Sequence, residues 1–327
     1  MDFLQLHQDS IIFDAHCDFL HEAVNQGRRF DVWYPDGHLD LPRLQQGGVT
    51  AQIFALFCVC QDETGKPRLD PTAEALRQFE AFYDMVDSNG KSFLTAVCAE
   101  EVERAKSEKK VAGILSLEGV EPLAGDIRLL RLFYRLGVRS LGLTWNYRNE
   151  AGDGVEVSDA SGLTEFGQCA VAECYRLGIM VDIAHLSPAG VDDVLKLADG
   201  PVIDTHANAF SVCQHPRNLT DAQLDGVAAS GGVVCVTFVP QFVADGRDGA
   251  SLEGVLDHID YIVHRIGPEH VGLGSDYEGY DGTTTGLTDV TKLPTLTEGL
   301  SVRGYKEGDI QRILGLNLLR VFRQIAG

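Results

Sequence analysis

Apolar runs alternate with helical patterns along most of this chain. Eight short runs rich in β-branched or other apolar residues occur at 11–15, 50–59, 112–117, 138–144, 179–184, 201–205, 232–239 and 270–275. Most are separated by stretches whose apolar residues recur every three or four positions, which is typical of amphipathic helices. Near-continuous apolar strands alternating with helices predict a parallel sheet that is covered on both faces.

Eight such strands favour a (β/α)8 barrel of the TIM type over a doubly wound sheet. A dinucleotide-binding fold would place Gly-x-Gly-x-x-Gly after the first strand, but Asp14-Ala15-His16-Cys17-Asp18 stands there instead. The long stretches 19–48, 60–110 and 277–305 are interpreted as rim insertions and extra helices. The prediction is therefore one hydrolase-type barrel domain over residues 1–327, ending in C-terminal helices.

Several helices have readable faces and limits. After Asp70-Pro71, a buried face is predicted from the spacing of Leu76, Phe79, Tyr83 and Val86. A helix cap is expected at Ser187-Pro188, and a capping box at Thr220 and Gln223. The last helix is expected to bury Ile310, Ile313, Leu314 and Val321.

Charge and composition exclude several classes of partner. The chain carries 48 acidic against 27 basic residues, a formal net charge of −21. Nucleic acids and anionic membranes require basic patches, so neither is an expected partner. No run approaches the ~20 apolar residues of a membrane span, and the N-terminus lacks a secretory signal pattern. The eight cysteines lie mostly in apolar patterns and are interpreted as reduced. A complete, cytoplasmic protein is expected.

Polar side chains gather at the predicted carboxyl ends of the strands. In a barrel of this type that end holds the active site. Collecting these positions yields three histidines and three carboxylates, namely His16, Asp18, Glu118, His185, His206 and Asp276.

The spacing of these residues suggests a metal site. His185 and His206 end consecutive strands, which lie about 4.8 Å apart in a sheet, so their imidazoles can converge. Barrel closure brings Asp276 beside His16 and Asp18, while Glu118 points in between the two groups. The set exceeds what one tetrahedral ion needs. Two ions about 3.5–4 Å apart, sharing a carboxylate and a hydroxide, would use all of it.

Position in the fold is needed to separate these residues from chance matches. Four His-x-Asp pairs occur, beginning at His7, His16, His38 and His258, and only the second follows an apolar strand. A single histidine near a strand is more often a hydrogen-bonded structural residue. Six polar groups at one end of a barrel are costly to bury without a metal or partner. His7, His21, His38, His258, His264 and His270 are assigned no role, and His215 is left undecided.

In these positions the chain resembles the renal (membrane) dipeptidase family, zinc peptidases of the amidohydrolase-like barrels. The similar segments cover almost the whole chain and are specific in this order: 14–18, 117–119, 182–185, 204–208, 217–221, 274–279 and 317–322. The resemblance implies that His16 and Asp18 bind one zinc ion, that His185 and His206 bind the other, and that Glu118 bridges them. Mn²⁺ or Co²⁺ also suits such ligands.

The resemblance also implies roles around the metals. Arg217 is the expected partner of the substrate's C-terminal carboxylate, and Asp276 the acid and base. Some family members have a histidine after strand four that contacts substrate. Here Trp145 stands at that position, so Trp145 and Asn146 are expected to face the substrate, with Tyr147 or Asn149 as alternatives to Asn146. The carbamylated lysine of other amidohydrolase branches has no counterpart on this strand.

The predicted function is therefore metal-dependent hydrolysis of dipeptides, including those with a C-terminal D-residue, by a hydroxide activated between two zinc ions with Asp276 and Glu118 as catalytic groups. Another amide or lactone hydrolase on the same metal site is the main alternative. A barrel that has lost its chemistry and acts as a binding protein is the second. The resemblance leaves a homodimer open.

Overall fold

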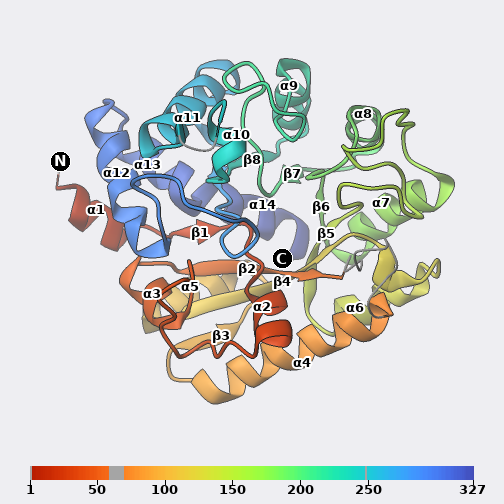
Figure 1. Ribbon diagram of the computed structural model, residues 1–327, viewed down its shortest axis with the longest axis horizontal. Coiled ribbons are helices and arrows are strands. Elements are labelled where there is room, and N and C mark those ends of the chain that lie inside the picture. Colours follow the sequence, from red (N-terminus) through yellow and green to blue (C-terminus); the bar gives the residue numbers. More distant parts are fainter. Residues whose placement is uncertain (1, 59–69, 247–248) are drawn as a thin grey trace.

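Eight parallel strands form a closed ring in the computed structural model, which describes residues 2–58, 70–246 and 249–327 (Figure 1). The ring closes because β1 pairs with both β2 and β9, and β2 pairs with β4. The predicted (β/α)8 barrel is confirmed, and residue 59 of the second predicted strand lies outside the described residues. The ring strands are β1 Phe13–Asp14, β2 Ala51–Phe57, β4 Val111–Glu118, β5 Val138–Gly142, β6 Met180–Asp182, β7 Val202–Asp204, β8 Val233–Val236 and β9 Val271–Leu273.

A ninth strand, β3 (Phe93–Thr95), lies outside the ring and, among the described strands, pairs with β4 alone. It pairs with the first three residues of β4, Val111–Gly113, while β5 pairs with the later residues of β4, from Leu115 onward. Residues 93–95 fall within 60–110, a stretch interpreted from the sequence as a rim insertion with extra helices. Three residues are too few to show a periodic pattern, which explains why the strand was missed.

Helices surround the ring on its outer face (Figure 1). No helix within the described ranges is long and apolar enough to cross a membrane. The α-helices are α1 Phe3–Asp9, α2 Phe19–Gln26, α3 Leu41–Gln46, α4 Pro71–Asn89, α5 Ala99–Glu108, α6 Arg128–Arg135, α7 Glu165–Leu177, α8 Pro188–Leu197, α9 Asp221–Ala229, α10 Pro240–Val243, α11 Leu252–Ile266, α12 Leu293–Val302, α13 Glu307–Gln311 and α14 Asn317–Ala326.

Local signals placed the helix starts correctly but one helix face incorrectly. Ser187 caps α8, and the capping box of Thr220 and Gln223 is present at α9. On α4, however, Leu76 is 48% exposed and Tyr83 37% exposed. The buried face is Glu74, Ala75, Gln78, Phe79, Phe82 and Met85. Glu74 and Gln78 are polar, so a search for apolar residues at helical spacing does not find this face.

The amino-terminal end of the barrel is filled by apolar side chains and closed by α14. Inward residues such as Phe13, Ile114 and Ile203 form one buried cluster with Leu318 and Phe322. The rings of Phe13 and Phe322 meet edge to face at 6.3 Å between centroids. The predicted last helix is broken into α13, a π-helical turn (Arg312–Leu316) and α14. The four residues expected to be buried there are buried.

Gly315 lies at the break in this last helix and has non-helical backbone angles. A Cβ at that position would collide with the backbone carbonyl of Ile11, just before β1. The glycine lets the turn lie directly against the barrel, so that α14 can cross its end. The cavity described below lies at the opposite, carboxyl end of the barrel.

Candidate metal centre and substrate pocket

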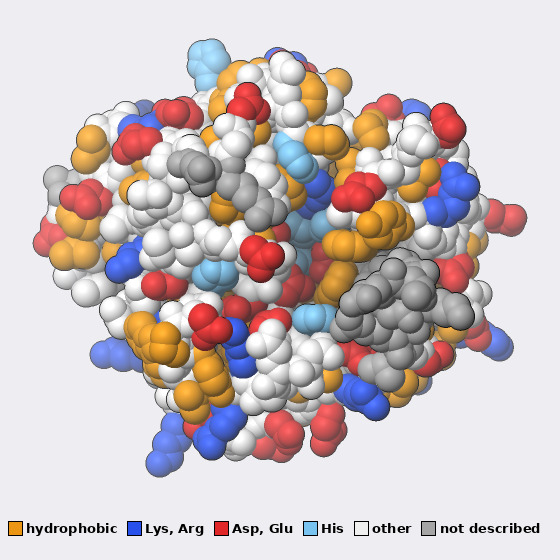
Figure 2. Space-filling view, in the orientation of Figure 1, with side chains coloured by type: hydrophobic (Ala, Val, Ile, Leu, Met, Phe, Trp, Pro, Cys, Tyr) orange, Lys and Arg blue, Asp and Glu red, His pale blue; other side chains and the backbone are white. Residues whose placement is uncertain are grey.

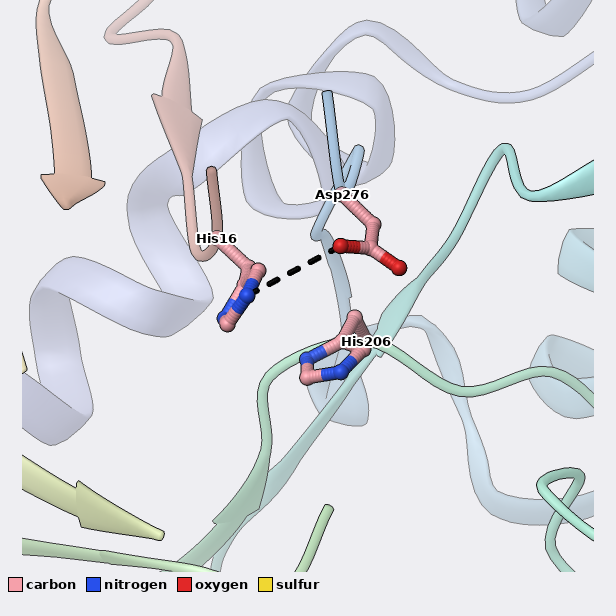
Figure 3. Close-up of side chains that lie close together, drawn as sticks. All are labelled: His16, His206 and Asp276. Atoms are coloured by element: carbon pink, nitrogen blue, oxygen red, sulfur yellow. Dashed lines mark ion pairs between the residues drawn. The ribbon is translucent and has the colours of Figure 1, made fainter. Parts of the chain in front are cut away.

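The carboxyl ends of five ring strands bring six predicted side chains together. His16 and Asp18 follow β1, Glu118 is the last residue of β4, and the remaining three follow β6, β7 and β9: His185, His206 and Asp276. All six are buried, with exposed fractions of 8% or less. Figure 3 shows His16, His206 and Asp276 turned toward one another from three different strands.

Glu118 lies at the middle of this cluster. Its Oε2 is 3.6 Å from His16 Nε2, and its Oε1 is 3.0 Å from His185 Nε2. His16 Nε2 is also 3.5 Å from Asp18 Oδ2 and 3.7 Å from Asp276 Oδ1. The two oxygens of one carboxylate therefore face two different groups of donor atoms, each able to hold an ion.

The donor atoms are arranged as metal ligands rather than as a closed hydrogen-bond network. His16 Nε2 and Asp18 Oδ1 are buried and lack a hydrogen-bond partner. His185 Nε2 and His206 Nε2 lie 2.7 Å apart. Both rings also have a polar partner at Nδ1, and their two Nε2 atoms face the same space within hydrogen-bonding distance of each other. Bound cations would use these atoms as ligands, and a set of imidazole nitrogens and carboxylate oxygens fits divalent metal ions.

The electrostatics of the cluster also favour a cation. Burial disfavours a charged His16, but Glu118 and the other nearby carboxylates outweigh burial and raise its pKa to about 10. Burial, opposed by the charge of His16, raises the pKa of Asp276 to about 7. Burial lowers the pKa of His185 and of His206 well below its usual range. A bound divalent ion supplies the positive charge that these carboxylates otherwise draw from a proton.

Backbone conformation holds two of these residues in place at some cost. His185 has φ 66° and Asp276 has φ 62°, in the left-handed region that side chains other than glycine rarely adopt. Gly279 closes the turn that begins at Asp276, since its backbone N–H donates to the Asp276 carbonyl at 3.0 Å. A Cβ at Gly279 would collide with the carboxylates of Asp18 and Asp276. Strained residues of this kind concentrate at functional sites.

A layer of buried aspartates beneath the cluster was missed from the sequence. Asp14 and Asp204 each stand two residues before a histidine and accept that histidine's backbone N–H, at 3.4 and 3.2 Å. Asp182 accepts from the backbone N–H groups of Ala184 and Thr205, both at 3.0 Å. The spacing Asp-x-His, which occurs at both Asp14 and Asp204, is the sequence signal for two of the three aspartates.

The residues expected to bind substrate lie around the same opening. Arg217 is 6% exposed, donates from Nη2 to the carbonyl of His206 at 3.0 Å, and has an unpartnered Nε. Trp145 lies 6.1 Å from His185 between ring centroids, so it forms a wall beside the cluster. Asn146 lines the opening and also binds His185 directly, since Oδ1 lies 2.6 Å from Nδ1. Sequence reasoning did not anticipate that second contact.

A cavity of about 1020 Å³ lies above the six side chains. Figure 2 shows it as a hollow near the middle of one face, where histidine and acidic side chains gather. His21 and His38, which had been assigned no role, line this cavity with Glu278 and Tyr280. His215 does not line it; its Nδ1 accepts the backbone N–H of Arg217 at 3.2 Å and supports that loop.

Comparison with known families agrees with this arrangement. The profile of the family described as "Membrane dipeptidase (Peptidase family M19)" matches residues 1–327. The chain belongs to this family. It is 33% identical to dipeptidase verJ of Clonostachys rogersoniana, over 98% of this chain and 86% of that protein. Membership makes the chain a hydrolase of the metallodipeptidase class, and the predicted resemblance is confirmed.

Solved structures of the membrane dipeptidase family share the fold throughout. A metallopeptidase from Rhodobacter sphaeroides, liganded with a phosphinate mimic of the dipeptide L-Ala-D-Ala, is 33% identical with a TM-score of 0.88. The similarity covers 98% of this chain and 100% of that one. The M19 metallopeptidase called dipeptidase AC is 34% identical with a TM-score of 0.88, covering 97% and 99%.

Proposed function

We propose that this metallodipeptidase cleaves dipeptides with two zinc ions, held by His16 and Asp18 on one side and His185 and His206 on the other. The supporting observation is the position of Glu118. Its Oε2 faces His16 Nε2 at 3.6 Å and its Oε1 faces His185 Nε2 at 3.0 Å. A carboxylate with its oxygens directed at two donor groups is suited to bridging two ions.

The reaction would combine the metals with groups of this chain. When bound, two zinc ions would supply Lewis acidity and an activated water. Asp276 reaches the same space, with Oδ1 3.7 Å from His16 Nε2. Its carboxylate is therefore placed to accept the proton of the attacking water and to deliver it to the leaving amine.

The pocket would select short substrates by their ends. Arg217 offers a nearly buried guanidinium with a free Nε. A planar guanidinium binds a carboxylate through two parallel hydrogen bonds, which suits the C-terminus of a dipeptide. Trp145 and Asn146 would confine the other side. The Rhodobacter relative holds a mimic of L-Ala-D-Ala, which supports proposing that a C-terminal D-residue is accepted here as well.

The test is hydrolysis of a panel of L-L and L-D dipeptides and matched tripeptides, before and after removal of metal with a chelator. Zinc is then added back while its stoichiometry is measured. The proposal expects two zinc ions per chain and chelator-sensitive turnover of dipeptides but not of tripeptides. Two bound ions with no dipeptide turnover would instead favour another amide or lactone as substrate. One ion per fully active chain would contradict the binuclear mechanism.

A further inference from the structure

Two side chains beneath the cluster connect β6 to the metal-facing histidine after β7. Thr205 Oγ1 lies 2.6 Å from Asp182 Oδ2 and 2.9 Å from His206 Nδ1. The exposed fractions of Asp182, Thr205 and His206 are 5%, 1% and 1%. We call this three-residue arrangement the hydroxyl relay.

Only one proton is available on the hydroxyl, so its direction decides the state of the histidine. Asp182 Oδ1 already accepts two backbone N–H groups at 3.0 Å, which fixes the carboxylate. A hydroxyl–carboxylate distance of 2.6 Å is typical of an O–H donating to a carboxylate oxygen. With its proton directed at Asp182, Thr205 Oγ1 can only accept from the histidine. His206 Nδ1 therefore carries the ring proton, and Nε2 presents its lone pair toward His185 Nε2, 2.7 Å away.

The neighbouring histidine has a different partner at Nδ1. His185 Nδ1 lies 2.6 Å from Asn146 Oδ1, and the amide Nδ2 of Asn146 donates to Glu156 Oε1 at 3.0 Å. That second bond orients the amide with its oxygen toward the ring. Asn146 is on the rim, whereas the hydroxyl relay is buried inside the barrel.

We propose that Thr205 and Asp182 are positioning residues that hold His206 with its proton on Nδ1 and its Nε2 directed at the metal. This inference rests on the metal centre of the proposed function. It assigns the two residues no contact with substrate. It predicts that affinity for one of the two ions depends on the hydroxyl of Thr205 and on the charge of Asp182.

Metal affinity provides the first test. Zinc binding to the full chain is measured by competition with a chromophoric chelator, with stoichiometry from elemental analysis. Thr205→Val keeps the shape and removes the hydroxyl, so affinity at one site should fall 10- to 100-fold, as for other partners of ligating histidines. Thr205→Ser should restore it. The matched control is Thr284→Val, which removes a buried hydroxyl that donates to the carbonyl of Phe238 at 2.6 Å and not to any of the six donor side chains.

The protonation state of His206 provides a second test that does not depend on activity. In zinc-free protein, ¹⁵N NMR of the imidazoles should show His206 protonated at Nδ1, with assignment by loss of the signal in His206→Gln. In Asp182→Asn the amide oxygen must take the place of Oδ1 to satisfy two backbone N–H groups. The amide NH₂ then donates to Thr205, the hydroxyl proton turns to the ring, and the ring proton moves to Nε2.

The outcomes separate this inference from the proposed function. Wild-type His206 protonated at Nε2, or wild-type zinc affinity in folded Thr205→Val, would overturn the hydroxyl relay. Wild-type protein that binds no zinc would overturn the proposed function, while the tautomer measurement would still decide the relay. Thermal unfolding of each zinc-free variant identifies a variant that does not fold. The tautomer of His206 is measured in the wild-type protein, and the His206→Gln variant serves only to assign its signal.

Discussion

The two ends of the barrel are made from the same strands but differ in chemistry. On the inward face of β4, Ala112 and Ile114 belong to the apolar cluster under α14, whereas Glu118 on the same strand reaches the metal cluster. On the first strand, Phe13 packs against Phe322, and three residues later His16 faces carboxylates. Within a few residues, each of these segments passes from an environment that excludes water and charge to one that concentrates charge.

This difference separates stability from function. Apolar side chains at the closed end gain free energy by burial alone. At the open end, burial of carboxylates and imidazoles costs free energy unless ions or partners satisfy them. Substitutions at the closed end should therefore change stability without changing metal binding. Substitutions at the open end should change metal binding without lowering stability. The following predictions test that separation.

The largest effect is expected for Glu118→Gln at the open end. Loss of the carboxylate charge that faces both histidine groups should reduce kcat/KM for a dipeptide by roughly 10⁴-fold, because binding and activation at the metals are both weakened. The matched control is Glu121→Gln, which alters a neighbouring carboxylate bound to Asn149 Nδ2 at 3.1 Å. Equal losses in both variants would contradict the role given to Glu118.

Phe322→Ala tests the closed end. Its ring is fully buried, so its removal should lower the free energy of unfolding by about 3–5 kcal/mol. Zinc affinity of the folded protein should stay unchanged. Denaturant unfolding and chelator competition measure the two quantities, with Val302→Ala, at an 81% exposed side chain, as the control. A large loss of zinc affinity would mean that the two ends are coupled.

Gly279→Ala tests how closely the open end is packed around its carboxylates. The added Cβ would collide with Asp18 and Asp276, so zinc affinity should fall by about 10- to 100-fold through displaced ligands. Gly308→Ala is the control, because a Cβ there meets only the end of an arginine side chain at 4.0 Å. Equilibrium competition with a chelator is the measurement, and unchanged affinity would show that the turn can relax.

A smaller, pH-dependent effect is expected from His258, which supports loops above the open end. Its Nδ1 accepts the backbone N–H of Ala209 at 3.1 Å, and its Nε2 lies 3.1 Å from the carbonyl of Val243. Burial lowers the pKa of His258 to about 4. The unfolded chain therefore binds a proton more readily, and stability is lost as the pH falls from about 6.5 toward 4.

Between pH 7 and pH 5 this histidine should account for about 2 kcal/mol of lost stability. Denaturant unfolding of wild type and His258→Gln at both pH values measures the difference. The variant should lose about 2 kcal/mol less than wild type on acidification. Equal losses in the two proteins would contradict a neutral, buried His258.

Several features could be predicted because they depend on local sequence. The eight ring strands were recognised from continuous apolar runs, and the six clustered side chains from their position directly after those runs. Short or mixed features were missed. Strand β3 has only three residues, the buried face of α4 includes Glu74 and Gln78, and at the break before α14 Gly315 lies against the backbone of Ile11, which is far away in sequence.

The apolar strands and the polar residues that follow them could be identified from the sequence alone. Both are visible locally, because the periodicity of a strand or helix depends on neighbouring residues alone. Which of those polar residues meet is a property of the closed ring. Pairing of β1 with β9 brings Asp276 to 3.7 Å from His16, although 260 positions separate them in sequence. The same folding brings Thr205 to Asp182 and leaves the pair that begins at His258 outside the cluster. The number of strands predicted the closed barrel, but the contact between Thr205 and Asp182 depends on packing of the whole barrel and has no signal in local patterns.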